Sequence, residues 1–242
     1  MGKDKANGSG ATEAFSIQSE AFAGQYSAKV CFRDRLFLFG DAVQKRTSPS
    51  SKILDFGCGP GIISIMLAQM GYVVVGIDGA PGMIQLASRK QKELALANVT
   101  FKMMSADDLS LPQEEFDGVV CSSVLEYIRD DMALLNKLIC ALKPGGHIFV
   151  SIPSSHSLGG VLEDAVRFLR RFIRWKNHGS VDVPLGQRRY NRQCLLDQLQ
   201  KMGVDCVQVT SFEWPMFKRL GVRLSRYPLF GIMLLVVGRK VK

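Results

Sequence analysis

The residues best suited to ligand chemistry are three glycines at alternate positions, Gly57, Gly59 and Gly61. An apolar run ends at these glycines, and apolar spacing typical of a helix begins directly after them. A buried strand must therefore turn sharply into a helix, and glycine permits both the backbone angles and the close approach of a ligand. The helix directs unpaired N–H groups and the positive end of its dipole back at the turn. We expect this turn to hold the polar part of a nucleotide-like ligand.

A carboxylate that suits the ribose of such a ligand follows the next apolar run. The string Y-V-V-V-G-I-D at 72–78 is typical of a parallel strand covered on both faces, and it ends at Asp78. An acid at the carboxyl end of the second strand of a β-α-β unit is placed to hydrogen-bond a ribose diol. The alternative is that Asp78 only caps the following helix. Because a buried carboxylate without a partner is costly, we favour the ribose contact.

The glycine spacing separates two classes of nucleotide-binding protein. A dinucleotide fingerprint, G-x-G-x-x-G, requires a glycine at position 62, where this chain has isoleucine. The string D-F-G-C-G-P-G at 55–61 instead resembles motif I of the class I S-adenosylmethionine-dependent methyltransferases, in the branch often called type 11. Three further landmarks of that family follow in order: S-A-D-D-L-S-L-P at 105–112, F-D-G-V-V-C-S-S-V-L-E-Y at 116–127 and K-P-G-G at 143–146.

The resemblance implies S-adenosyl-L-methionine as the cofactor and a set of residues around it. These are Tyr26, Arg33, Asp55, Gly57, Gly59, Gly61, Asp78, Gly79, Met83, Ser105, Ala106, Asp107 and Cys121. In the family the position of Met83 packs on adenine. Ser105 replaces the acid that usually meets the adenine amino group, which leaves this contact to Asp107 or to a backbone group. Tyr26 and Arg33 resemble the aromatic and arginine pattern of an N-terminal helical lid, with plain helix packing as the alternative.

The catalytic residues are harder to assign. A sulfonium is already an activated methyl donor, so the protein mainly has to hold the acceptor in line with the methyl carbon. A phenol or alcohol acceptor must also lose a proton to a base. His156, which follows the fifth expected strand at the ligand-binding edge of the sheet, is one candidate, with an ordinary loop histidine as the alternative. Tyr127 is the second candidate catalytic residue, as a group that could orient the acceptor. It stands where many quinone-modifying members of the family carry histidine.

The remaining histidines and tyrosines have smaller expected roles. His147 lies inside a strand and is interpreted as structural, and His178 falls in a basic loop. Tyr26 and Tyr190 could orient an acceptor, as Tyr127 could. The sequence has no histidine–carboxylate cluster, so no metal site is expected.

The fold implied by the resemblance is α/β. It is a Rossmann-like, seven-stranded, mostly parallel sheet with helices on both faces and an antiparallel edge strand. With 242 residues, 47% of them hydrophobic, the chain can bury a sizeable core as one domain. We expect a disordered N-terminus at 1–11 and a single methyltransferase domain at 12–242. The parts of that domain are a lid of two helices at 12–46, a cofactor-binding core at 50–153, an acceptor-side insertion at 154–192, and a C-terminal helix with edge strands at 193–242.

The charge of the chain is concentrated in its last third. Residues 1–153 hold 15 Lys and Arg against 16 Asp and Glu, whereas residues 154–242 hold 16 against 6. Such a field favours anionic ligands, membrane surfaces or nucleic acid, and solubility alone is the alternative. Residues 158–175 place apolar side chains on one half of an ideal helix and mostly arginines on the other. This pattern fits either a helix that covers the cleft or one that contacts anionic lipid. Aromatic and basic residues also alternate after Trp214, which fits base stacking or a lipid interface.

These patterns favour methyl transfer to oxygen of a lipophilic or anionic small molecule, such as a quinone, phenol, polyketide or lipid. The alternatives are an RNA or protein methyltransferase and a non-catalytic S-adenosylmethionine-binding partner protein. The chain lacks an N-P-P-Y-type motif, which makes nucleic acid the less favoured partner. Six cysteines without C-x-x-C pairing indicate reduced thiols and a cytoplasmic location. The longest apolar stretches are too short to cross a bilayer, which leaves peripheral contact with an anionic membrane as the open question.

Overall fold

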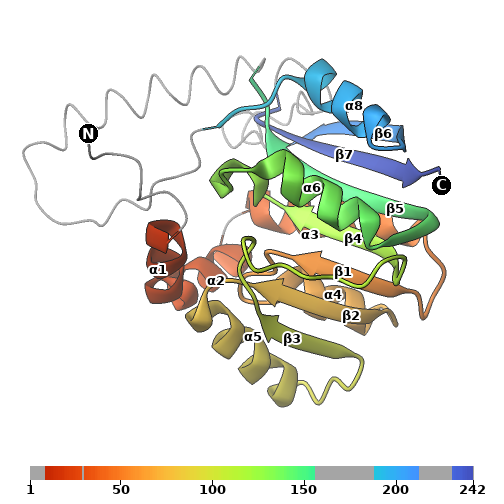
Figure 1. Cartoon of the computed structure of the whole chain (residues 1–242). Coiled ribbons are helices and arrows are strands. Elements are labelled where there is room, and N and C mark those ends of the chain that lie inside the picture. The colour runs from red at the N-terminus through yellow and green to blue at the C-terminus, as the bar shows by residue number, and fades with distance from the viewer. Residues whose placement is uncertain (1–8, 29, 156–187, 213–230, 242) are drawn as a thin grey trace, which may run out of the picture.

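The structure is a computed structural model that describes residues 9–28, 30–155, 188–212 and 231–241 (Figure 1). Its strands are β1 (Lys52–Phe56), β2 (Val73–Asp78), β3 (Val99–Met103), β4 (Phe116–Ser122), β5 (Leu142–Pro153), β6 (Val204–Phe212) and β7 (Met233–Lys240). Its helices are α1 (Ser9–Ile17), α2 (Ser19–Ala28), α3 (Val30–Gln44), α4 (Ile62–Gln69), α5 (Pro81–Glu93), the 3₁₀ turn η1 (Leu125–Tyr127), α6 (Asp131–Cys140) and α8 (Arg192–Lys201).

The seven strands form one sheet in the order β3-β2-β1-β4-β5-β7-β6. Strands β1 to β5 pair in parallel, and β7 runs antiparallel to both of its neighbours. Parallel neighbours need crossover connections, which the helices between the strands supply. This arrangement confirms the predicted Rossmann-like sheet. The single reversed strand is β7, and β6 forms the edge outside it.

Helices cover both faces of the sheet (Figure 1). On one face, α6 and α8 bury a cluster that includes Leu135 and Leu199 against β1, β4 and β5. On the other face, α3 and α4 bury a second cluster that includes Phe39 and Leu67. Because the central strands are covered on both sides, their sequences are almost continuously apolar. A polar side chain inside this sheet therefore needs a specific partner.

The N-terminal segment differs from the sequence-based expectation. It forms three helices rather than two, and the first begins at Ser9, so residues 9–11 belong to α1 and not to a disordered terminus. The extra break falls at Gln18, directly before Ser19, a residue type favoured at helix starts. Residues 1–8, the basic segment at 158–175, the aromatic and basic segment after Trp214, and the histidines 156 and 178 lie outside the described residues.

The carboxyl ends of β1, β2, β4 and β5 meet at one edge of the sheet, because these strands are parallel. Helix α1 lies at this edge (Figure 1, red), where it packs against α5. The chain also returns here after residue 187, since Tyr190 forms a bridge with Ser154. The hydroxyl of Tyr190 donates to Asp131 Oδ2 at 2.6 Å, and Arg188 pairs with the same oxygen at 2.7 Å. Both ends of the expected acceptor-side insertion are thus held next to each other beside the site.

No helix in the described ranges is long and apolar enough to cross a membrane.

Candidate cofactor and acceptor site

The turn between β1 and α4 has the backbone that its glycines predict. Gly57, Gly59 and Gly61 have φ angles of 71°, 53° and 74°, in the left-handed region that favours glycine. The amide of Gly57 donates to the carbonyl of Ile77 at 2.7 Å, which ties the turn to the end of β2. A Cβ on Gly57 would lie 2.2 Å from Val124 Cγ2, and one on Gly61 would lie 2.7 Å from the Phe101 ring. The turn is therefore a closely packed backbone surface.

Asp78 joins this turn to the start of α5. Its Oδ2 accepts the amide of Gly59, and its Oδ1 accepts the amide of Ala80, each at 2.8 Å. Burial raises the pKa of Asp78, while the two N–H groups act in the opposite direction. Ala80 is the N-cap residue of α5, so this bond closes a short turn directly before the helix, and the helix itself has no side-chain cap. Each carboxylate oxygen keeps a further lone pair, so the two bonds leave capacity for a ligand diol.

Asp55 lies beneath the glycine turn and is almost fully buried. Ser64 donates its hydroxyl to Asp55 Oδ2 at 2.6 Å, whereas Oδ1 has no hydrogen-bond partner among the described residues. Burial raises the pKa of Asp55 to about 7; the Ser64 hydrogen bond opposes this shift, and the charge of Asp78 adds to it. A buried carboxyl with an unused oxygen favours a cationic or N–H-bearing group nearby.

The loop after β3 lies against the loop after β2. A Cβ on Gly79 would be 3.6 Å from Ser105 Cα, so the two backbones are in contact distance. The Ser105 hydroxyl donates to Asp108 Oδ2 at 2.7 Å and accepts the amide of Asp108 at 3.2 Å, which closes a short turn. Asp107 is exposed, and Ala106 packs against the core. The structure therefore brings Gly79, Ser105 and Asp78 to one wall of the site.

Some of the predicted site residues lie deeper or farther out than expected. Met83 is 2% exposed and Cys121 is fully buried. Burial, together with the charges of Glu126 and Asp55, raises the pKa of Cys121, so its thiol is a neutral core group. Arg33 is exposed on α3, whereas Arg35 is buried, and Tyr26 lies on α2. His147 pairs with Gly118 in the parallel ladder, near the amino end of β5, which is consistent with a structural role.

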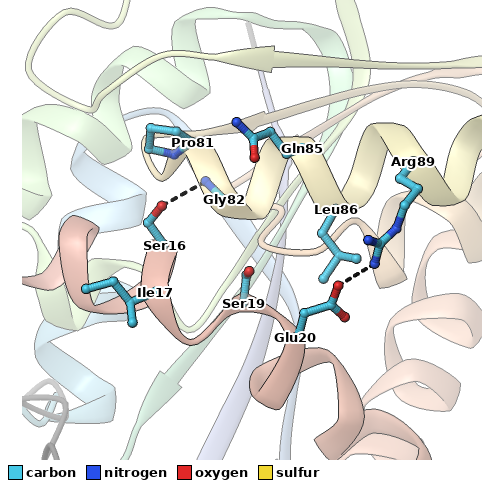
Figure 2. Close-up of a pocket in the computed structure, with 9 residues that line it drawn as sticks. All are labelled: Ser16, Ile17, Ser19, Glu20, Pro81, Gly82, Gln85, Leu86 and Arg89. Atoms are coloured by element: carbon cyan, nitrogen blue, oxygen red, sulfur yellow. Dashed lines mark hydrogen bonds and ion pairs between the residues drawn. The ribbon is translucent and has the colours of Figure 1, made fainter.

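The N-terminal helices contact two separate walls of the site. The ring of Phe15 meets the ring of Tyr127 edge-on, with centroids 5.3 Å apart. The next residue, Ser16, accepts the amide of Gly82 at 2.8 Å (Figure 2). Consecutive residues of α1 therefore touch η1 after β4 and the first turn of α5 after β2. Sequence reasoning missed both contacts, because nothing local to Phe15 or Ser16 indicates partners so far along the chain.

An ion pair also connects α2 to α5. Glu20 and Arg89 form an ion pair across a groove of about 470 Å³ between the two helices (Figure 2). Both side chains are more than half exposed, so the pair adds little stability by itself. Together with the Ser16 hydrogen bond it connects α1 and α2, part of the predicted lid, to α5.

The solved structures that this chain resembles share its fold. A protein of Haloferax volcanii, from a complex between the Trm112 methyltransferase activator and a methyltransferase, superimposes with a TM-score of 0.68 at 19% identity, covering 95% of this chain and 99% of that one. A SAM-dependent methyltransferase of Methanosarcina mazei gives 0.61 at 22% identity, covering 83% and 97%. These identities are low, so the likeness shows the fold, which is the Rossmann-like fold of methyltransferases.

A family model matches the central part of the chain. Residues 53–146 match the model described as "Methyltransferase domain". The match includes the glycine turn, Asp78 and the K-P-G-G turn, and it agrees with the motifs found in the sequence.

Two relatives found by sequence similarity have a more specific name. Ubiquinone biosynthesis O-methyltransferases of Xanthomonas campestris pv. campestris and Xylella fastidiosa are each 36% identical, over 104 and 113 residues. The matches cover 43% and 46% of this chain, and the same shares of those proteins. The match thus spans less than half the length of these relatives.

The pKa of Asp55 predicts a pH-dependent stability. Because folding raises this pKa from its ordinary value of 3.8 to about 7, the folded state favours the protonated carboxyl. The free energy of unfolding should therefore fall by roughly a few kcal/mol between about pH 4 and about pH 7, and then level off. Asp55→Asn should lack this fall in chemical denaturation measurements. The exposed carboxylate variant Asp205→Asn is the control, and an equal fall in Asp55→Asn and wild type would contradict the prediction.

The contact between Ser16 and Gly82 predicts a role for the lid in ligand release. A Cβ on Gly82 would lie 2.4 Å from the Ser16 carbonyl oxygen, whereas one on Gly24 of α2 would meet nothing within 4 Å. Overpacking of this kind costs about 1–3 kcal/mol, so Gly82→Ala should release S-adenosylhomocysteine roughly tenfold faster in stopped-flow measurements. Gly24→Ala, which gains the same helix propensity, should release it at the wild-type rate. Equal rates for the two variants would show that the lid contact does not limit release.

Proposed function

We propose that this protein transfers the methyl group of S-adenosylmethionine to an oxygen atom of a lipophilic or anionic small molecule. The observation that carries the proposal is Asp78, whose carboxylate joins the left-handed glycine turn to the first turn of α5. This is the arrangement that a ribose-bearing ligand requires at the carboxyl edge of such a sheet.

The residues of this chain fit the cofactor. The glycine turn offers a backbone surface without side chains, and Asp78 keeps lone pairs for the two ribose hydroxyls. Asp55 would stabilise the positively charged amino acid part, since its Oδ1 is unused among the described residues. Gly79 and Ser105 would border the adenine, with Met83 supporting them from within the core. When bound, the cofactor supplies a methyl group on a sulfonium with a neutral leaving group.

The chain's own contribution to the reaction would be positioning and exclusion of water. Tyr127 lies in η1 directly after β4, and Phe15 of the lid covers it. We expect Tyr127 to orient an acceptor oxygen, and His156 is the candidate for taking up its proton. Orientation of this kind can supply on the order of 7–11 kcal/mol of the barrier. The names of the relatives from Xanthomonas and Xylella support oxygen as the methylated atom and a quinone or phenol as the acceptor.

The test uses methyl-labelled S-adenosylmethionine and a lysate of source cells separated into organic, nucleic-acid and protein fractions. Asp78→Ala removes two charge-assisted hydrogen bonds and the ribose ligand, so it should weaken S-adenosylhomocysteine binding by roughly 100-fold or more in calorimetry. Asp205→Ala, which removes an exposed carboxylate from β6, is the matched control. With wild-type protein, the label should enter the organic fraction.

Three other results would contradict part or all of the proposal. Label in RNA or in protein would overturn the small-molecule acceptor. Cofactor binding without label in any fraction would favour the non-catalytic S-adenosylmethionine-binding alternative. Wild-type protein that binds neither S-adenosylmethionine nor S-adenosylhomocysteine would overturn the proposal as a whole.

We also propose that the basic C-terminal third meets an anionic membrane surface beside the acceptor entrance. Support comes from the excess of 16 Lys and Arg over 6 Asp and Glu in residues 154–242. The described ends of the insertion, Ser155 and Arg188, both lie at the carboxyl edge of the sheet, next to the site. A surface there would present a lipophilic acceptor without requiring it to cross water.

Vesicle sedimentation tests this contact. At low salt the protein should bind phosphatidylglycerol vesicles and not phosphatidylcholine vesicles, and binding should weaken as salt is added. The double variant Arg170→Glu/Arg171→Glu should bind less, whereas Lys102→Glu on the exposed face of β3 should bind as wild type does. Equal binding of wild type to both lipids would exclude an electrostatic contact.

A further inference from the structure

Ser123, directly after β4, has an unusual backbone conformation. Its φ angle is 55°, in the left-handed region that residues other than glycine, asparagine and aspartate rarely adopt. Such a conformation persists only when the surrounding structure holds it in place, and it is found disproportionately at functional sites. A specific contact must therefore hold Ser123 in this conformation.

The contact comes from Ser151 on the neighbouring strand β5. Ser151 is fully buried and lies between the apolar residues Val150 and Ile152, where a hydroxyl is costly unless it is bonded. Its Oγ accepts the amide of Ser123 at 3.1 Å, and its carbonyl oxygen accepts the same amide at 3.2 Å. The Ser122 hydroxyl lies 3.2 Å from the same Oγ. One buried serine therefore holds both the end of β4 and the left-handed residue after it.

The left-handed turn directs the next residues toward the glycine turn between β1 and α4. Val124 lies over Gly57, where its Cγ2 would be 2.2 Å from any added Cβ. The amide of Tyr127 then donates to the carbonyl of Val124 at 2.9 Å, which forms η1 and places the Tyr127 ring under Phe15. The turn at Ser123 thus sets the wall that faces the glycine turn, and the lid contact follows from it.

We infer that Ser151 is a positioning residue for the cofactor and acceptor site. It acts through Ser123, whose strained backbone it stabilises, and it does not itself touch a ligand. The inference rests on the proposed binding of S-adenosylmethionine. If Ser151 acts in this way, glycine at position 123 should make the Ser151 hydroxyl dispensable, because glycine adopts a positive φ without strain.

The experiment is a double-mutant cycle read by calorimetry with S-adenosylhomocysteine, with thermal midpoints measured in parallel. Ser151→Ala should weaken binding roughly tenfold, because the left-handed turn loses the side-chain acceptor of the Ser123 amide and keeps only the Ser151 carbonyl. Ser123→Gly/Ser151→Ala should recover most of the lost affinity. Ser50→Gly/Ser151→Ala is the matched control, since Ser50 is also left-handed, with a φ of 65°, but lies in the turn before β1; it should recover none. Ser211→Ala, which removes another buried serine hydroxyl, should bind as wild type does.

A further variant leaves Ser151 in place in case Ser151→Ala does not fold. Ser123→Val puts a β-branched residue at the left-handed position and should weaken binding on its own. Wild-type affinity in Ser151→Ala or in Ser123→Val, or equal recovery from glycine at positions 50 and 123, would overturn the inference while leaving the proposed function intact. Absence of binding in wild type would instead overturn the proposed function, and the inference with it.

Discussion

The two hydrogen bonds accepted by Asp78 hold the site together. The carboxylate receives the amide of Gly59 from the turn after β1 and the amide of Ala80 from the start of α5, so two crossover connections meet at one side chain. Gly59 is left-handed within the turn, and Ala80 is the N-cap residue of α5, whose N–H group has no partner inside the helix. A backbone turn held in this way has its conformation before a ligand binds, which reduces the entropy lost on binding.

The opposite wall depends on a different interaction, between two polar residues of the sheet. β4 and β5 are otherwise apolar at their carboxyl ends, and the Ser151 hydroxyl is the group that fixes how the chain leaves β4. The lid then joins the two walls, because Phe15 and Ser16 are consecutive residues with partners on opposite sides. The glycine turn, the segment after β4 and helix α1 are thus linked by a few hydrogen bonds between backbone amides and side-chain oxygens and by the ring contact between Phe15 and Tyr127.

Much of the fold and of the cofactor wall could be predicted from sequence, because the signals are local. The glycines precede a helical pattern directly, and Asp78 ends a β-branched run, so strand, turn and acid are specified within a few residues. Contacts between distant segments carry no such signal. Ser151 resembles any serine in a strand until its pairing with β4 is known, and the thiol of Cys121 could be assigned to the core only once α6 was placed over it. The break at Gln18 was also missed, because a single non-helical residue leaves the apolar periodicity nearly unchanged.

The reversed strand β7 has a practical consequence for handling the protein. Because β7 runs opposite to its neighbours, it carries the chain away from the carboxyl edge, and the Lys240 ammonium ends beside the carbonyl of Leu142 at the start of β5. The end of β7 therefore lies at the opposite edge of the sheet from helix α1 (Figure 1). A fluorophore or surface tether attached near position 241 would leave the cofactor entrance accessible, whereas a bulky group fused close to α1 would stand beside it.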